Sequence, residues 1–477
     1  MKQEIKVTTM KRLKKYLLAI PLLLLAVSCG EDFTVLAPQS ERNVENFYQT
    51  DTDFATAING AYSSLAHNDA YGRNYMLLLE MRSDNTTNAG GATGLAESLE
   101  RITLFTELAT AGELERAWVG AYRGIARTNT ILNRLDNYTF TNSALGQRTE
   151  GEALFIRSLL YYNLAVIFGN VPLQLDEVTS SSVVVNQVSA AAVYSQISAD
   201  LERAENLLPA SYSGANIGRA TSGAAATLLG LVQLTAGNNG QAAAAFNRVV
   251  NSNQYSLVSE YSDLWGSTNE NSVESIFEIQ YKSGGQGTGS GYTEYYSPDL
   301  RISGGVGGGN VPQGVTDDLL SIYEEGDARG MGGTFGLTAE ENEYLSKYDA
   351  AQSIAFDSDV NLIVFRYADV LLMLAEALGE SPEAWALINQ VRQRAGLTTD
   401  AATLPGSFRD ILLLERRREL AGENKRWPDL LRFGVAQPVM ASFYSNEGYT
   451  DGNIRTLYPI PQRELDSAPG QLTQNPM

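Results

Sequence analysis

The feature that most constrains the fold is a helical hydrophobic period that recurs along the chain. Between Phe54 and Leu65, apolar residues return at intervals of three and four, the pattern of a helix with one buried face. Strand-like runs are few, and SIFEIQY at residues 275–281 is the best of them. The sequence therefore predicts a mostly α-helical protein. The other helices that it predicts span residues 115–135, 150–168, 190–207, 220–236, 240–251, 361–378, 383–394 and 407–421.

Several of these helices fall into pairs joined by short turns rich in Gly and Asn. In residues 221–250, Gly230 on one helix and Ala242 and Phe246 on the next resemble the helix-turn-helix unit of tetratricopeptide repeats. Each such pair buries its apolar face against the following pair. We therefore expect a tetratricopeptide-repeat-like helical-pair scaffold with irregular loop-rich insertions and a few short strands. The helical pairs are predicted at about 50–265 and 360–395, and a loop-rich, ligand-facing insertion at about 270–360.

The only cysteine, Cys29, ends an apolar run that follows a basic amino-terminal cluster. This order is typical of a signal peptide, and the run is shorter than the roughly 20 apolar residues of a membrane span. Ala-Val-Ser-Cys also resembles a bacterial lipobox, which implies cleavage after Ser28 and lipidation of Cys29. We thus expect residues 1–28 to be a lipoprotein signal peptide and 29–45 a lipidated tether. The basic cluster begins at Met10, so the first residue and Met10 are alternative translation starts.

Charge and composition exclude several function classes. The formal net charge is -20, and such a surface repels phosphate backbones, so no nucleic-acid partner is expected. The chain has one histidine, His67, which disfavours zinc hydrolases and Ser-His or Cys-His catalysis. Residues 357–361 start like a calcium loop but lack its later Gly and Glu, so we predict no metal site, although bound calcium stays open. No cofactor is predicted.

Short motifs follow one another in a specific order along the chain. They include AWVGAYRGIARTNTILNRL at 117–135, GEALFIRSLLYYNLAVIFGNVPL at 151–173, FRYADVLLMLAEAL at 365–378, ALINQVRQRAGL at 386–397, ILLLERRRELAGENKRWPDLLRFG at 411–434 and LYPIPQRELDSAPGQLTQNP at 457–476. In this order, after a lipobox, they resemble the SusD/RagB family of outer-membrane nutrient-binding lipoproteins. The resemblance implies a single domain over residues 46–477, with the carboxyl-terminal family motifs at 365–476.

The resemblance also implies a function. Such a protein is lipid-anchored in the outer membrane, faces the cell exterior, captures an oligosaccharide and caps a SusC-like TonB-dependent transporter. It binds its ligand and is not an enzyme. Two alternatives stay open: a RagB-like peptide-uptake lipoprotein, and a surface glycoside hydrolase, for which no pair of carboxylates stands out in the sequence.

A sugar site combines aromatic rings, which stack on the apolar face of the sugar, with polar groups for its hydroxyls. The four tryptophans lie in or beside the scaffold motifs, which leaves tyrosines as candidates. Tyr296→Ala is accordingly expected to weaken glycan binding without lowering the melting temperature; the alternative is that these tyrosines pack at the surface or meet the transporter. The predicted ligand residues, from residues 67–88 and a glycine-rich loop at 283–312, are Tyr71, Tyr75, Asp84, Asn85, Tyr292, Tyr295 and Tyr296.

The charged motif residues are predicted to form a structural ion network. On the predicted helix over 361–378 the charged residues share a narrow arc of an otherwise apolar surface, so they must be paired. Their spacing allows Arg366 to pair with Asp369. On a later helix it allows Glu415 to pair with Arg418, and Arg416 with Glu419. The predicted network consists of Arg366, Asp369, Glu376, Glu415 and Arg418.

Overall fold

The structure is a computed structural model that describes residues 47–88, 97–178, 186–298, 313–450 and 453–476. The chain divides into two compact units, residues 1–53 and 54–477. The signal peptide, Cys29 and the tether lie outside the described residues. Everything below concerns the second unit.

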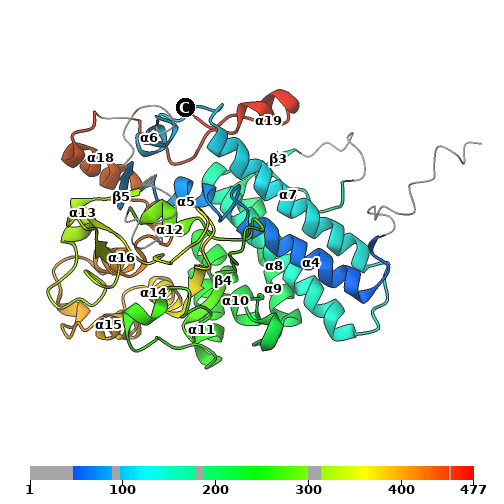
Figure 1. Ribbon diagram of the computed structural model, residues 1–477, viewed down its shortest axis with the longest axis horizontal. Coiled ribbons are helices and arrows are strands. Elements are labelled where there is room, and N and C mark those ends of the chain that lie inside the picture. Colours follow the sequence, from blue (N-terminus) through cyan, green and yellow to red (C-terminus); the bar gives the residue numbers. More distant parts are fainter. Residues whose placement is uncertain (1–46, 89–96, 179–185, 299–312, 451–452, 477) are drawn as a thin grey trace, which may run out of the picture. The chain divides into compact units, whose positions relative to one another are not determined.

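Long helices follow one another and pack as neighbours in the first half of the chain (Figure 1). Helix α8 lies against α7 and α9, and α10 lies against α9 and α11. Helix α8 begins earlier than the period predicted, because the side chain of Asn142 accepts a hydrogen bond from the Leu145 amide and caps its first turn. These helices are α4 (Asp51–Ala66), α7 (Gly112–Leu135), α8 (Ser143–Phe168), α9 (Ala190–Leu207), α10 (Ser222–Thr235) and α11 (Asn239–Asn251).

The paired packing of the helices confirms the tetratricopeptide-like scaffold. A β-carbon on Gly230 of α10 would overlap the ring of Phe246 on α11, so the glycine lets the two helices approach closely. A second pair, α14 (Tyr367–Leu378) and α15 (Pro382–Arg394), packs beside α11 and is joined by a turn through Gly379 at φ +67°. Ser381 caps α15 by accepting from the Ala384 amide.

One predicted helix is partly wrong. Residues 361–378 are predicted as a single helix, but β8 (Leu362–Arg366) precedes α14 and pairs antiparallel with β4 (Ser275–Ile279). All five residues of β8 are buried, and its Ile-Val-Phe core suits a pleated, packed strand. This short sheet connects the first helical half to the carboxyl-terminal helices.

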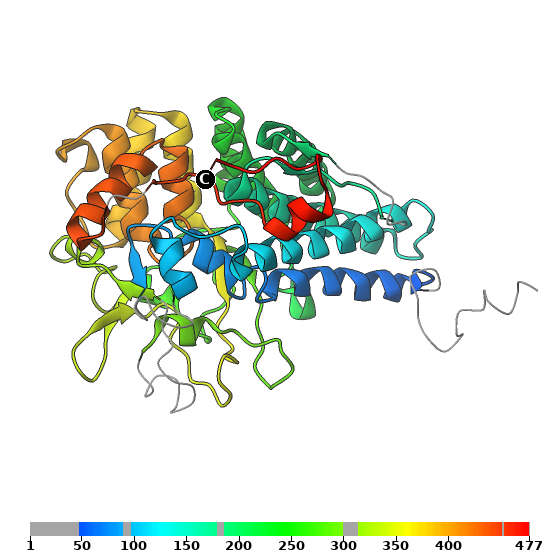
Figure 2. The same ribbon diagram turned by 90° about the horizontal axis from the view of Figure 1, so that it is seen from above.

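Most of the remaining elements are short. Figure 2 shows the irregular segment that follows β4, in green to yellow, lying largely on the side away from α14 and α15. The described residues form sixteen α-helices in all. The remaining helices and strands are α5 (Asn74–Leu79), α6 (Glu97–Thr103), α12 (Tyr292–Tyr296), α13 (Asp317–Ser321), α16 (Phe408–Leu420), α17 (Arg426–Arg432), α18 (Ala436–Glu447), α19 (Gln462–Ser467), and the antiparallel pairs β1 (Thr86–Asn88) with β5 (Gln313–Val315), β2 (Val171–Pro172) with β3 (Gln187–Val188), and β6 (Phe335–Leu337) with β7 (Glu343–Leu345).

The core is built around α8. Within the described residues, α8 is the one helix long and apolar enough to cross a membrane, and its apolar window is wholly buried inside the protein. Its rings pack against other elements; for example, Phe155 meets Phe277 of β4 edge to face, with ring centroids 4.8 Å apart. We therefore interpret α8 as the central core helix.

Candidate functional site

The five tyrosines predicted to bind ligand are buried. Tyr296 and Tyr292 of α12 are wholly inaccessible, and their rings stack at 6.1 Å. The Tyr292 hydroxyl donates to the Tyr71 carbonyl at 2.8 Å. Tyr75 and Tyr295 are also at most 6 % exposed. Because these rings have no free face, their positions do not support direct contact with a ligand.

The two polar residues of the predicted ligand set are also internal. The Asp84 carboxylate accepts two hydrogen bonds from Arg426, at 2.7 and 2.8 Å, and lies 3.2 Å from Arg417. Asn85 donates to Glu80 at 2.8 Å and accepts from Arg417 at 2.9 Å. Burial raises the pKa of Asp84, but the two guanidinium groups outweigh it and hold the pKa at about 2. Both residues therefore tie the early loop to the carboxyl-terminal helices.

Asp84→Asn should change how stability depends on pH. Because the folded pKa of Asp84 lies below its unfolded value, its contribution is present above about pH 4 and is lost as pH falls toward 2. The free energy of unfolding of the variant should be lower by about 2 kcal/mol at neutral pH. Urea unfolding of both proteins between about pH 7 and pH 3 should show this difference shrinking. A difference that is constant with pH would contradict the assignment.

The exposed aromatic residue on the loop side is one that the sequence analysis missed. Phe356 is 43 % exposed, has φ at +58°, and its ring lies 5.5 Å from that of Tyr295. The side chain of Ile354 nearby in the chain is 47 % exposed. A bulky residue held at positive φ with its ring outward is strained, and such strain is concentrated at functional sites. Tyr295, from the glycine-rich loop, therefore packs against the ring of the exposed Phe356.

Two aspartates hold the start of the glycine-rich loop. Asp357 accepts from the amides of Gly284 and Gly285, both at 2.8 Å, and Asp359 accepts from the Ser283 amide at 2.8 Å. Their oxygens therefore support the backbone. In the described ranges, no group of three or more His, Cys, Asp or Glu side chains is placed to hold a metal ion.

Next to this loop is a cleft of about 410 Å³. This volume is in the roughly 300–1,000 Å³ range of small-molecule sites. The cleft lies among the second half of α4, helix α7, residues 215–219, β4 and the loop at 287–288. Its lining residues include Asn59, Tyr62, Ser63, Leu65, His67, Arg127, Ile217, Gly218, Arg219, Phe277, Gln280 and Thr288.

The cleft has an apolar wall and a polar edge. Tyr62, Ile217 and Phe277 supply apolar surface, and Ile217 is 52 % exposed. The Tyr62 hydroxyl accepts from the Ala220 amide at 2.9 Å, which fixes the ring. Asn59 and Gln280 form a polar edge: the Asn59 side chain accepts from Arg219 at 2.6 Å, and the Gln280 amide exchanges hydrogen bonds with that of Asn271 at 3.0 Å, so both are held in place. This arrangement matches a ligand that has one apolar face and a hydroxyl-rich rim.

Gly218 shapes this cleft. Its φ is +89°, a conformation that L side chains rarely adopt, and a β-carbon there would lie 2.5 Å from the Gln280 side chain. The glycine therefore lets the 215–219 segment pass close to β4 with Gln280 still at the edge.

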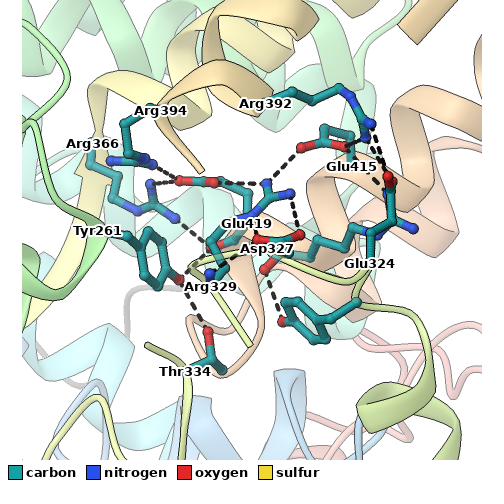
Figure 3. A network of polar contacts seen from close by, with 12 residues as sticks. Tyr261, Glu324, Asp327, Arg329, Thr334, Arg366, Arg392, Arg394, Glu415 and Glu419 are labelled. Atoms are coloured by element: carbon teal, nitrogen blue, oxygen red, sulfur yellow. Dashed lines mark hydrogen bonds and ion pairs between the residues drawn. The ribbon is translucent and has the colours of Figure 1, made fainter. Parts of the chain in front are cut away.

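Beneath the loops lies a buried ion network (Figure 3). Arg366, at the end of β8, pairs with Glu423 at 2.8 Å and with Glu274 at 3.0 Å. It also pairs with Glu419, which Arg329 and Arg394 contact too. Burial raises the pKa of Glu419, but the guanidinium groups, that of Arg394 first, hold it far below its usual value.

The predicted pairs within single helices are mostly replaced by long-range pairs. Arg366 does not pair with Asp369, because the strand β8 directs Arg366 toward Glu419 and Glu423, whereas Asp369 pairs with Arg416 at 2.9 Å. Arg416 in turn pairs with Asp429 and not with Glu419.

The other predicted network members also have ionic partners. Glu415 pairs with Arg329 at 2.6 Å and lies 3.7 Å from Arg418, the one predicted spacing that the structure contains. Glu376 accepts from the Nε and Nη2 edge of the Arg432 guanidinium at 2.7 and 2.8 Å. All five residues therefore take part in ion pairs that join the carboxyl-terminal helices.

Two protein-family models match different parts of the chain. The model described as "SusD family" matches residues 342–477. The model described as "Starch-binding associating with outer membrane" matches residues 38–234. Together with the helical-pair fold, these matches decide the family. The chain belongs to the SusD/RagB family.

Relatives along the whole chain agree with this SusD/RagB assignment. SusD-like protein P2 of Formosa agariphila is 28 % identical over 522 residues, covering 97 % of this chain and 100 % of the relative. A solved laminarin-binding SusD-like protein has a TM-score of 0.77 at 29 % identity, covering 90 % of this chain and 100 % of its own. Surface glycan-binding protein A from Bacteroides thetaiotaomicron, solved with laminarihexaose, has the same TM-score at 25 % identity, with the same coverage.

Proposed function

We propose that this SusD/RagB protein captures oligosaccharides at the cell surface. The observation that carries the proposal is the 410 Å³ cleft, in which apolar surface around Tyr62 and Phe277 lies beside a polar edge that includes Ser63 and Arg127. Similarity to glycan-binding SusD-like proteins supports the same ligand class. The outward ring of Phe356 offers a second stacking surface on the adjoining loop. Binding and release, rather than catalysis, is the proposed activity.

The proposal extends to the place of the protein in the cell. The lipobox-like sequence before Cys29 supports lipidation of that residue, and the family model's description supports an outer-membrane location. A protein anchored in this way faces the exterior and passes its ligand to a SusC-like TonB-dependent transporter that it caps. Two acyl chains or more are needed for stable anchoring, which a lipidated amino-terminal cysteine provides.

Ser63→Trp is expected to abolish oligosaccharide binding. Ser63 is exposed on the cleft-facing side of α4, and an indole there would fill the cleft without disturbing the core. Calorimetry against a panel of oligosaccharides that includes laminarihexaose should find at least one ligand for the wild type and none for the variant. The same panel, analysed for new reducing ends, tests for glycosidase activity.

Ser445→Trp is the matched control, because Ser445 is exposed on α18 and does not line the cleft. It should bind as tightly as the wild type. If Ser63→Trp binds oligosaccharide as tightly as the wild type, the cleft is not the binding site. If only a peptide mixture gives binding, the protein is a peptide-uptake lipoprotein instead, and release of sugar products would identify a hydrolase.

A further inference from the structure

The cleft presents arginines although the chain is strongly anionic. Its lining includes Arg127 and Arg219, against a formal net charge of -20 for the whole chain. Among its described lining residues the one carboxyl group is Glu278, which is 2 % exposed. Glu278 accepts hydrogen bonds from the Asn271 amide and the Asn361 side chain, and burial raises its pKa. It therefore offers little negative charge to a ligand in the cleft.

The charge of Arg219 is already neutralised by a carboxylate of the protein, that of Glu152. Its guanidinium contacts Glu152 at 3.3 Å, Asn59 at 2.6 Å and Asn216 at 3.0 Å. These three contacts engage Nη1, Nη2 and Nε, and Glu152 balances the charge. All three nitrogens of Arg219 are thus engaged, and the side chain holds the cleft edge in place.

Arg127 differs from Arg219, the other arginine that lines the cleft. Its Nη1 donates to the Gly60 carbonyl at 3.0 Å and to Ser64 Oγ at 2.7 Å, which fixes the side chain on α4. Its partners among the described residues are these neutral oxygens, with no ion pair to a carboxylate there. The Nε and Nη2 edge is therefore left for a ligand, on an exposed residue that lines the cleft.

From this geometry we infer that Arg127 makes the cleft selective for oligosaccharides that carry an acidic group, a uronate carboxylate or a sulfate ester. The inference rests on the proposed function. A guanidinium edge presents two parallel N–H donors that match two oxygens of a carboxylate or sulfate. The net negative charge of the chain disfavours an anionic ligand, so the guanidinium of Arg127 supplies the local attraction in this cleft. The neighbouring apolar wall then packs against the sugar ring that bears the acid.

Matched pairs of ligands test the inference. Oligogalacturonates, oligoalginates and sulfated galactan oligosaccharides are compared by calorimetry with their carboxyl-reduced or desulfated forms. At least one acidic member should bind at least about tenfold more tightly than its neutral counterpart, and its affinity should fall as salt rises. Arg127→Gln should weaken the acidic ligand about tenfold and leave the neutral one unchanged. Arg127→Lys, which keeps the charge but not the fork, should fall between.

Arg123→Gln is the control, because Arg123 is exposed one turn earlier on the same helix, is paired with Asp69 at 3.3 Å and does not line the cleft. It should leave every affinity unchanged, and melting temperatures should show that all variants fold. Tight binding of neutral oligosaccharides only, unaffected by Arg127→Gln, would overturn the inference while the capture function stands. Binding of no oligosaccharide at all, or of peptides alone, would overturn both.

Discussion

Arg366→Ala is expected to lower the free energy of unfolding by about 3 to 5 kcal/mol, the cost of removing one partner from a buried ion pair. Arg366 is 1 % exposed and contacts three carboxylates, those of Glu274, Glu419 and Glu423. Its Nη2 also donates to the Glu419 carbonyl at 2.6 Å. Without it, Lys347 and Arg394 would have to balance carboxylates that remain buried. Since whole domains are stable by only about 5–15 kcal/mol, much of the protein is expected to be unfolded.

Urea unfolding, followed by circular dichroism, measures this loss. Arg463→Ala is the control, because Arg463 also pairs with a carboxylate, that of Glu115 at 2.7 Å, but with the two side chains 71 % and 36 % exposed. Such surface pairs contribute about 0–1 kcal/mol. If Arg366→Ala unfolds at the same urea concentration as this control, the network does not hold the scaffold together.

The helical pairs could be predicted because their signal is local. A helix that buries one face repeats its apolar residues every three or four positions, and the partner helix follows within a short turn. The predicted helix at 361–378 begins too early, because its first residues form a strand whose partner no local signal reveals. LIVF, the first four residues of β8, is a short continuous apolar run, which periodicity cannot assign to strand or helix. Its partner β4 lies far away in the sequence.

The ion network could be predicted only in part. Burial of charged residues on an apolar helix requires that they be paired, and that requirement is readable from the sequence. Their partners are not, because they come from distant segments: Glu274 for Arg366, and Arg329 for Glu415. Only the pair of Glu415 and Arg418, which lie within one helix turn, could be predicted from residue spacing.

The candidate site was the least predictable part. Residue type indicates that a tyrosine can stack on a sugar, but not whether its ring is free, and Tyr292 and Tyr295 pack inside while Phe356 is exposed. The cleft is assembled from five separate segments, so no motif marks it. His67, which the sequence analysis used only to disfavour catalytic classes, lies at its edge.

Tyr296→Ala separates the sequence-based expectation from the structural one. The sequence predicts weaker glycan binding at an unchanged melting temperature, whereas the structure predicts a loss of stability. The Tyr296 ring is wholly buried, lies 5.1 Å from that of Tyr348 and stacks on Tyr292. Removing a buried aromatic side chain costs about 3–5 kcal/mol, because the cavity that it leaves does not close.

The variant Tyr296→Phe helps to distinguish a role of Tyr296 in ligand binding from a role in packing. It keeps the ring and removes only the hydroxyl, whose bond to the Gly422 carbonyl is long, at 3.4 Å. We therefore expect its free energy of unfolding to stay within about 1 kcal/mol of the wild type in urea unfolding. If Tyr296→Ala is stable and binds glycan more weakly, Tyr296 contacts the ligand, as the sequence predicts. A destabilised Tyr296→Ala beside an unaffected Tyr296→Phe would show that α12 acts by packing, and that the surface available to a glycan is the cleft and the loop outside it.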